Sequence, residues 1–162
     1  MFRRSEFCRP MRAGEEAAVA RLLRRAFENE GEMRIVERLR RDGAIAGELV
    51  LPDGAALIGY CALSEMRAPP GWLCLGPVAI DPAWQDLGHG HRMVAWVAEW
   101  ARRSGCRVVV LGPPDFYESA GFSRARAQGL RSPFPVTNTL LAGPGRDVPE
   151  VELLYPSAFE ET

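Results

Sequence analysis

A short run of polar residues and glycines, Gln85-Asp86-Leu87-Gly88-His89-Gly90, has the composition of a loop that binds an anion. Two glycines one residue apart let the backbone turn sharply and approach a ligand with no Cβ in the way. The run lies between an apolar segment typical of a strand and a segment whose apolar residues recur at helical spacing. A helix that begins there presents unpaired N–H groups and the positive end of its dipole, so the run predicts a diphosphate site.

Two other glycine-rich phosphate loops fit this run poorly. A Walker A loop needs Gly-Lys followed by Ser or Thr, whereas all 20 basic residues of this chain are arginine. A dinucleotide-binding fingerprint needs a third glycine where Met93 stands. It also needs an acidic residue after the next strand, where Gly112-Pro113-Pro114 stands instead. Neither loop is predicted.

A second motif, Phe116-Tyr117-Glu118-Ser119-Ala120-Gly121-Phe122, follows after one expected helix and one expected strand. Together, Gln-x-x-Gly-x-Gly and Tyr-x-x-x-Gly-Phe in this order resemble the GNAT superfamily of N-acetyltransferases, in which the first motif binds acetyl-CoA. The similarity covers nearly the whole chain. Segments 26–40 and 154–159 resemble the YhbS-like branch of that family, and segment 75–82 resembles the family's central strand and the turn that follows it.

The resemblance implies acetyl-CoA as the cosubstrate and a set of residues that bind it. Its diphosphate would accept hydrogen bonds from N–H groups of residues 87–92, and its pantetheine arm would pair with the backbone of a strand splayed from its neighbour. One N–H group of that strand would polarise the thioester carbonyl as an oxyanion hole. The implied cofactor-binding residues are Val78, Ala79, Ile80, Gln85, Leu87, Gly88, His89, Gly90, His91 and Arg92, the last through its charge.

Tyr117 is the catalytic residue that the resemblance implies, as the acid that protonates the departing thiolate. A phenol with a pKa of about 10 can donate to a thiolate whose thiol has a pKa of about 8.5, at a modest uphill cost. The alternative is that its ring packs against CoA and donates nothing. No general base is assigned, because segment 72–80 has no acidic residue and Glu30, Glu32 and Glu65 are only candidates.

No metal is expected. His89 and His91 form a His-x-His pair, but no convincing third ligand accompanies them. The cysteines are scattered without a C-x-x-C pair, which favours reduced thiols in a cytoplasmic protein. They are Cys8, Cys61, Cys74 and Cys106. Residues 1–10 lack the apolar core of a secretory signal, and no run approaches the ~20 apolar residues of a membrane span.

Length and composition indicate one globular domain over residues 1–162, with 47% apolar and 25% charged residues. A chain of this length buries about 70% of its unfolded surface. The formal net charge is −1, so no global field attracts nucleic acid or an anionic membrane, and neither is expected as a partner. The expected partner is a small-molecule or peptide amine. A homodimer, frequent in the family, is left open.

The order of the expected elements predicts an α+β domain with a mixed sheet flanked by helices, as the resemblance also implies. Helices are predicted over 14–27, 32–41 and 90–104, with a short one ending at 119, and strands over 5–8, 44–51, 55–65, 72–80, 107–111 and 151–155. Residues 124–149 are not assigned.

These observations predict an enzyme that moves acetyl from acetyl-CoA to a primary amine. The alternative is a sensor or assembly module of the same fold that binds CoA or acyl-CoA without catalysis. Such a module would keep Gly88 and Gly90 but would need neither Tyr117 nor a base. Transfer of a longer acyl group would differ only in the depth of the pocket.

Overall fold

The computed structural model describes residues 7–160, which contain a six-stranded sheet in the order β1-β2-β3-β4-β5-β6. β4 and β5 are parallel, and the other neighbouring pairs are antiparallel. The strands are β1 (Arg9–Pro10), β2 (Ile45–Asp53), β3 (Ala56–Glu65), β4 (Leu73–Ile80), β5 (Val108–Leu111) and β6 (Thr139–Ala142). The helices are α1 (Glu16–Phe27), α2 (Gly31–Arg41), α3 (His89–Ser104), α4 (Pro114–Ser119) and α5 (Ser157–Glu160). The predicted α+β fold with a mixed sheet is confirmed.

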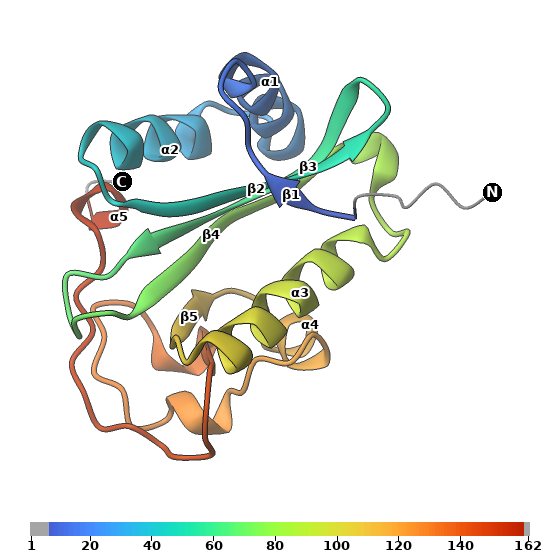
Figure 1. The fold of residues 1–162 in the computed structure, drawn as a ribbon. Helices are drawn as coiled ribbons and strands as arrows, with labels where there is room; N and C mark the ends of the chain where they lie inside the picture. The colour runs from blue at the N-terminus through green and yellow to red at the C-terminus, as the bar shows by residue number, and fades with distance from the viewer. Residues whose placement is uncertain (1–6, 161–162) are drawn as a thin grey trace.

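Helices cover both faces of the sheet: α1 and α2 lie on one face and α3 and α4 on the other (Figure 1). Side chains of β3 alternate between the two layers. Tyr60 and Ala62 pack with residues of α1 and α2, whereas Cys61 and Leu63 pack with residues of α3. Because both faces are covered, β3 is apolar almost without interruption. No helix among residues 7–160 combines the length and apolar composition needed to cross a bilayer.

β4 contains a bulge at Gly76-Pro77. Leu75 and Val78 pack into the same core although a regular strand would turn residues three apart to opposite faces. Their partners on β3 are Leu63 and Cys61, so one residue of β3 stands opposite two of β4. Pro77 has no N–H to donate, which suits a position where the ladder is interrupted. The bulge therefore sets which side chains of the second half of β4 face α3.

The predicted elements up to residue 119 are confirmed, apart from small shifts of their ends and the first strand. Part of the strand predicted over 5–8 lies outside the described residues, and the first strand described is β1. The strand predicted over 151–155 is wrong, since this segment makes only isolated bridges from Glu152 and Leu154. The last strand is β6, which lies in the segment that the sequence left unassigned.

The alternation of buried and exposed residues over 151–155 does not come from pairing in the sheet, as the strand prediction assumed. Leu153 and Tyr155 are buried against the sheet residues Cys74, Val109 and Leu141, on the same face as α1 and α2 but over strands that these two helices do not cover. An extended segment that lies across a sheet buries every second side chain, as a strand within the sheet does. Alternation alone therefore cannot distinguish the two.

Candidate functional site

β4 and β5 pair only at the start of β4, which leaves the sheet open beyond that point. The parallel register joins Leu73 to Val108, Cys74 to Val109 and Leu75 to Val110. β5 then ends at Leu111, whereas β4 continues to Ile80. Among residues 7–160, the edge of β4 after Leu75 consequently has no strand partner on this side. The splayed strand pair that the sequence predicted lies here.

The three residues of β4 predicted to contact pantetheine, Val78, Ala79 and Ile80, do not all turn their N–H groups to the same side. Asp81 N–H donates to Ile58 O at 2.8 Å, which fixes the side on which β3 lies. Because N–H directions alternate along a strand, the polar backbone groups of Ala79 also turn toward β3. The N–H groups of Val78 and Ile80 turn the other way, into the opening. The N–H groups of Val78 and Ile80 are therefore available to a ligand in the opening, whereas that of Ala79 is paired with β3.

The predicted anion loop joins β4 to α3. Gly88 is the N-cap of α3 and has φ of 84°, a conformation that favours glycine. The first bond of the helix runs from Arg92 N–H to Gly88 O at 3.0 Å, so the N–H groups of residues 89–91 have no intrahelical acceptor. Gln85 Nε2 donates to Ile80 O at 3.0 Å and holds the loop against the end of β4.

A cavity of about 360 Å³, the loop cavity, lies between this helix end and α4. An added Cβ at Gly90 would lie 3.4 Å from Ile80 Cγ1 and 3.6 Å from Phe116 Cζ, so a larger side chain there would fill the space. The loop cavity is lined by Val78, Ile80, Trp84, Gln85, Asp86, Gly88, His89, Gly90, His91, Phe116 and Tyr117. Most of the predicted cofactor-binding residues are therefore brought together in one place.

Ala79, Leu87 and Arg92 do not line the loop cavity. The side chain of Leu87 is exposed, so Leu87 contributes to the loop only through its backbone. The guanidinium of Arg92 lies 4.0 Å from the centre of the Phe7 ring, in a cation–π contact. In this arrangement Arg92 does not line the loop cavity, and its guanidinium is not placed to contact a diphosphate there.

The two histidines of the loop have structural partners. His91 Nε2 lies 2.9 Å from Ser119 O, and since a carbonyl oxygen only accepts, Nε2 carries the proton. This bond ties the start of α3 to the end of α4. The His89 ring packs edge-on against Trp84, with 5.8 Å between centroids. Within the described range, 7–160, no group of three His, Cys, Asp or Glu side chains could hold a metal ion.

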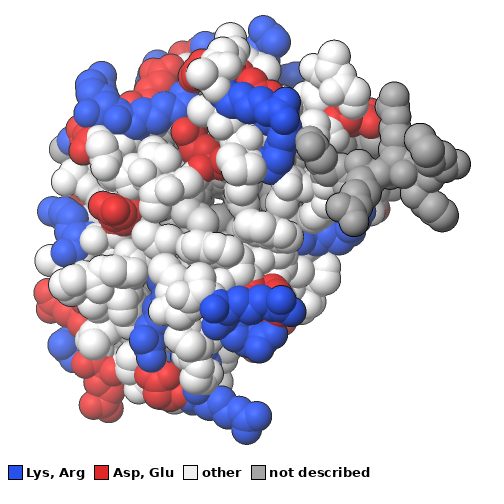
Figure 2. All heavy atoms as spheres, viewed as in Figure 1, with Lys and Arg blue, Asp and Glu red and all other residues white. Residues whose placement is uncertain are grey.

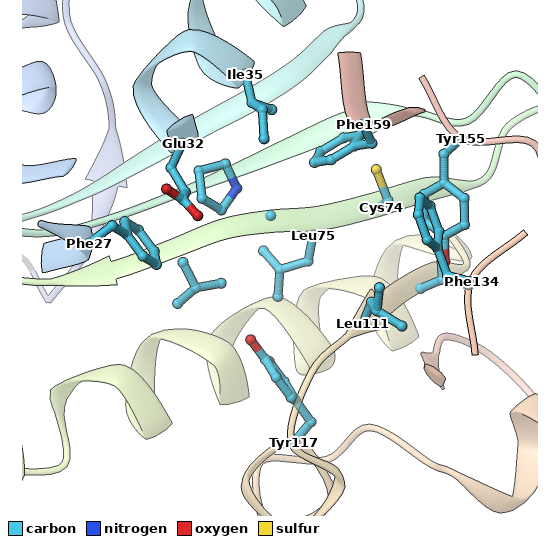
Figure 3. A pocket seen from close by; sticks show the side chains of 14 residues that line it. Phe27, Glu32, Ile35, Cys74, Leu75, Leu111, Tyr117, Phe134, Tyr155 and Phe159 are labelled. Carbon is cyan, nitrogen blue, oxygen red and sulfur yellow. The ribbon is translucent and has the colours of Figure 1, made fainter. Parts of the chain in front are cut away.

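A second cavity of about 370 Å³, the aromatic cavity, adjoins the opening between β4 and β5 (Figure 3). Val78 and Tyr117 line both cavities, so the two meet at the splayed strands. The aromatic cavity is lined by Phe27, Glu32, Ile35, Cys74, Leu75, Gly76, Pro77, Val78, Val109, Leu111, Tyr117, Phe134, Tyr155 and Phe159.

Tyr117 lies at this junction on α4, with its hydroxyl directed into the aromatic cavity (Figure 3). Its ring packs edge-on against Phe116 and Phe122, with centroids 5.0 and 5.9 Å away. An added Cβ at Gly112 would collide with the ring, so the glycine leaves room for it. Burial raises the pKa of Tyr117 to about 12, and the phenol is neutral at physiological pH.

Of the three acidic residues that the sequence left as candidate bases, Glu32 lines the aromatic cavity, and Glu30 and Glu65 line neither the aromatic nor the loop cavity. Glu30 forms ion pairs with arginines of α1 and α2 at 3.2 and 3.5 Å, and Glu65 is exposed at the end of β3. Glu32 is the second residue of α2, and its Oε2 is buried with no hydrogen-bond partner in the described part of the chain. Figure 3 shows its carboxylate directed into the cavity from the wall opposite Tyr117.

Sequence reasoning missed most of the aromatic cavity. Besides Tyr117, four aromatic rings line it: Phe27 at the end of α1, Phe134 between β5 and β6, Tyr155 after β6, and Phe159 in α5. Three of these rings belong to the last third of the chain, and this concentration of aromatic residues was the one signal in the sequence. Nothing local predicts that they meet.

Comparisons with known proteins agree with this geometry. The model of the acetyltransferase (GNAT) family matches residues 13–122. The chain is 32% identical over 123 residues to the uncharacterized N-acetyltransferase YhbS of Escherichia coli K12, which covers 73% of this chain and 74% of YhbS. The crystal structure of E. coli YhbS in complex with CoA has a TM-score of 0.84 at 26% identity and covers 94% of this chain and 91% of its own. A GNAT acetyltransferase from Brucella melitensis in complex with acetyl-CoA has a TM-score of 0.78 at 27% identity, with 94% and 96% covered.

Proposed function

This chain belongs to the GNAT acetyltransferase family, and we propose that it transfers an acetyl group from acetyl-CoA to a primary amine. The observation that carries the proposal is that the loop cavity and the aromatic cavity meet at Val78 and Tyr117. A thioester in the first cavity and an amine in the second would bring the reacting atoms together there. The similar proteins that bind CoA and acetyl-CoA support the same ligand here.

In this proposal the diphosphate of acetyl-CoA binds at the start of α3. No arginine or lysine is among the described residues that line the loop cavity, so the N–H groups of residues 88–91 and the helix dipole supply the positive potential. Gln85 keeps the loop in place through Ile80 O. The pantetheine arm lies along the free edge of β4 and accepts a hydrogen bond from Ile80 N–H, which leaves Val78 N–H for the thioester.

The transfer step uses one donor on each side of the thioester. The amine nitrogen attacks the carbonyl carbon, and Val78 N–H donates to the oxygen as it becomes negative, a contribution of about 3 kcal/mol. The C–S bond then breaks, the sulfur takes the proton of the Tyr117 hydroxyl, and the proton that the attacking nitrogen loses restores the tyrosine. A tyrosine pKa of about 12 makes this acid weaker than the sequence suggested. Because the same desolvation also raises the pKa of the thiol, the gap between the two pKa values grows by less than the rise in the tyrosine pKa alone.

A CoA-binding module without transfer is the second candidate. The observation that favours it is the absence of an acidic side chain from β4, Leu73–Ile80. Substitution of Tyr117 distinguishes the two candidates, since a module that only binds has no need of a proton donor. The proposal also places the protein in the cytoplasm, which its four free cysteines support.

The experiment that tests the proposal is a calorimetric titration with acetyl-CoA, desulfo-CoA and NAD, followed by an assay of thiol release with a panel of amines. We expect both CoA compounds to bind and NAD not to bind. Binding without thiol release from any amine would favour the second candidate. If neither CoA compound binds, the loop cavity is not a CoA site and the proposal fails.

A further inference from the structure

The walls of the aromatic cavity are suited to an apolar body. Phe134 and Tyr155 pack edge-on with 5.0 Å between centroids, and Phe159 continues the wall at 6.4 Å from Tyr155. Ile35 and Leu111 add aliphatic surface. Edge-on rings of this kind leave room and favourable geometry for another aromatic ring. In Figure 2 the band of surface between α2 and α3 is mostly uncharged and is hollowed near its centre.

Glu32 is the one acidic or basic side chain among the described residues that line this cavity. Its Oε2 is buried and has no hydrogen-bond partner among residues 7–160. The neighbouring arginines of α2 do not neutralise it, because Arg34 pairs with Glu30 at 3.5 Å and Arg38 with Asp42 at 3.2 Å. Glu32 is half-buried, and its buried oxygen presents an acceptor to the cavity that a cationic ligand can pair with.

These observations describe a site for a ligand with a cation at one end and an apolar body at the other. A cation paired with Glu32 would face Val78 and Tyr117 on the opposite wall, where the thioester is proposed to lie. No arginine or histidine lines the cavity within the described part of the chain, so a carboxylate or phosphate on the ligand would find no partner.

We propose that the acceptor is a primary amine on an aromatic body with no acidic group, an arylalkylamine, and that Glu32 binds its ammonium and takes the first proton. This inference rests on the proposed function. The ammonium gives one proton to Glu32, which releases it to water, and the neutral nitrogen attacks the acetyl carbon. The C–N bond forms, the C–S bond breaks and sulfur takes the Tyr117 proton. The second nitrogen proton restores the tyrosine.

The first test compares 2-phenylethylamine with L-phenylalanine, which differ only in the α-carboxylate, and with an alanine-terminated peptide, by thiol release from acetyl-CoA. We expect kcat/KM for 2-phenylethylamine to exceed that for L-phenylalanine about 100-fold or more, because the carboxylate would be buried unpaired beside Glu32. If the amino acid or the peptide is acetylated as well as the amine or better, the inference is wrong while the proposed function stands. If no amine reacts although acetyl-CoA binds, both fail.

The second test is Glu32→Gln, with Glu37→Gln on the exposed side of the same helix as the matched control. With CoA bound, 2-phenylethylamine should bind the native protein about 10-fold or more tightly than the neutral 2-phenylethanol. Glu32→Gln should abolish this preference and raise KM for the amine, with the Kd of acetyl-CoA unchanged. Glu37→Gln should behave as the native protein. Retention of the preference for the ammonium in Glu32→Gln would overturn the role of Glu32.

Discussion

Tyr117→Phe is the substitution that tests the transfer step most directly. It removes the hydroxyl at the junction of the two cavities and keeps the ring, whose contacts with Phe116 and Phe122 hold α4 in place. A positioned general acid contributes about 100- to 10,000-fold, so we expect kcat to fall by at least about 100-fold, or about 2.7 kcal/mol. The Kd of acetyl-CoA should change by less than about threefold, because the contacts with Val78 and the start of α3 are retained.

The raised pKa of Tyr117 gives this prediction a second, independent part. With a pKa of about 12, about 99% of the tyrosine still carries its proton at pH 10, whereas a pKa of about 10 would leave about half. The native enzyme should therefore show no alkaline decline in kcat up to about pH 10. Initial rates of thiol release at saturating acetyl-CoA and amine measure this directly.

Tyr60→Phe is the matched control, since it also removes a buried tyrosine hydroxyl but lies outside both cavities. Tyr60 donates to Glu48 at 2.6 Å, so this variant should lose about 1.5 to 3 kcal/mol of unfolding free energy and keep its kcat. Undiminished kcat in Tyr117→Phe would show that the hydroxyl is not the acid. An alkaline limb centred near pH 10 in the native enzyme and absent from Tyr117→Phe would refute the argument from burial.

Three further predictions concern the loop cavity, the C-terminal segment and alkaline stability. Gly90→Val should weaken acetyl-CoA binding about 10-fold or more with little change in Tm, because the valine Cγ atoms would occupy the space between Ile80 and Phe116. The control is Gly47→Val, whose Cβ meets nothing within 4 Å. Equal Kd values for Gly90→Val and the native protein would contradict the assignment of the cavity. Leu153→Ala should cost about 2–5 kcal/mol in urea unfolding although Leu153 lies outside the sheet, because it is fully buried; a cost below about 1 kcal/mol would mean that the segment does not pack as described. Burial raises the pKa values of Tyr117, Tyr155 and Cys74 to about 12, so the native state binds more protons than the unfolded state between about pH 9 and 12. This contribution to stability is complete below about pH 9 and is lost as pH rises, by up to about 1.4 kcal/mol per pH unit for each group; unfolding free energies that stay constant from about pH 8 to 11 would contradict it.

Local motifs in the sequence were sufficient to predict the loop and the helix that follows it. The turn at Gly88, the bond from Arg92 N–H to Gly88 O and the free N–H groups of residues 89–91 all arise within a few residues of one another. Such features depend on backbone conformation and on hydrogen bonds between near neighbours, so the spacing of residue types along the chain is enough to predict them. For the same reason the helices and central strands were placed nearly correctly.

Features that depend on contacts between distant segments were not predictable in the same way. The bulge at Gly76-Pro77 becomes visible only when β4 is paired with β3, and it decides that Val78 rather than Ala79 turns its N–H into the opening. Arg92 looked suited to a diphosphate by its position, but Phe7, far away in sequence, holds its guanidinium elsewhere. The segment 151–155 alternates as a strand does, yet it lies across the sheet.

The sequence by itself therefore determined the family resemblance, the order of elements up to residue 119, the loop and the position of Tyr117, because each depends on residues close together along the chain. The tertiary structure alone decided that Glu32 and rings from four segments surround one cavity, and that this cavity meets the loop cavity at Val78 and Tyr117. An acceptor pocket is assembled from residues more than a hundred positions apart. Its charge and shape are properties of their packing, which no spacing along the chain encodes.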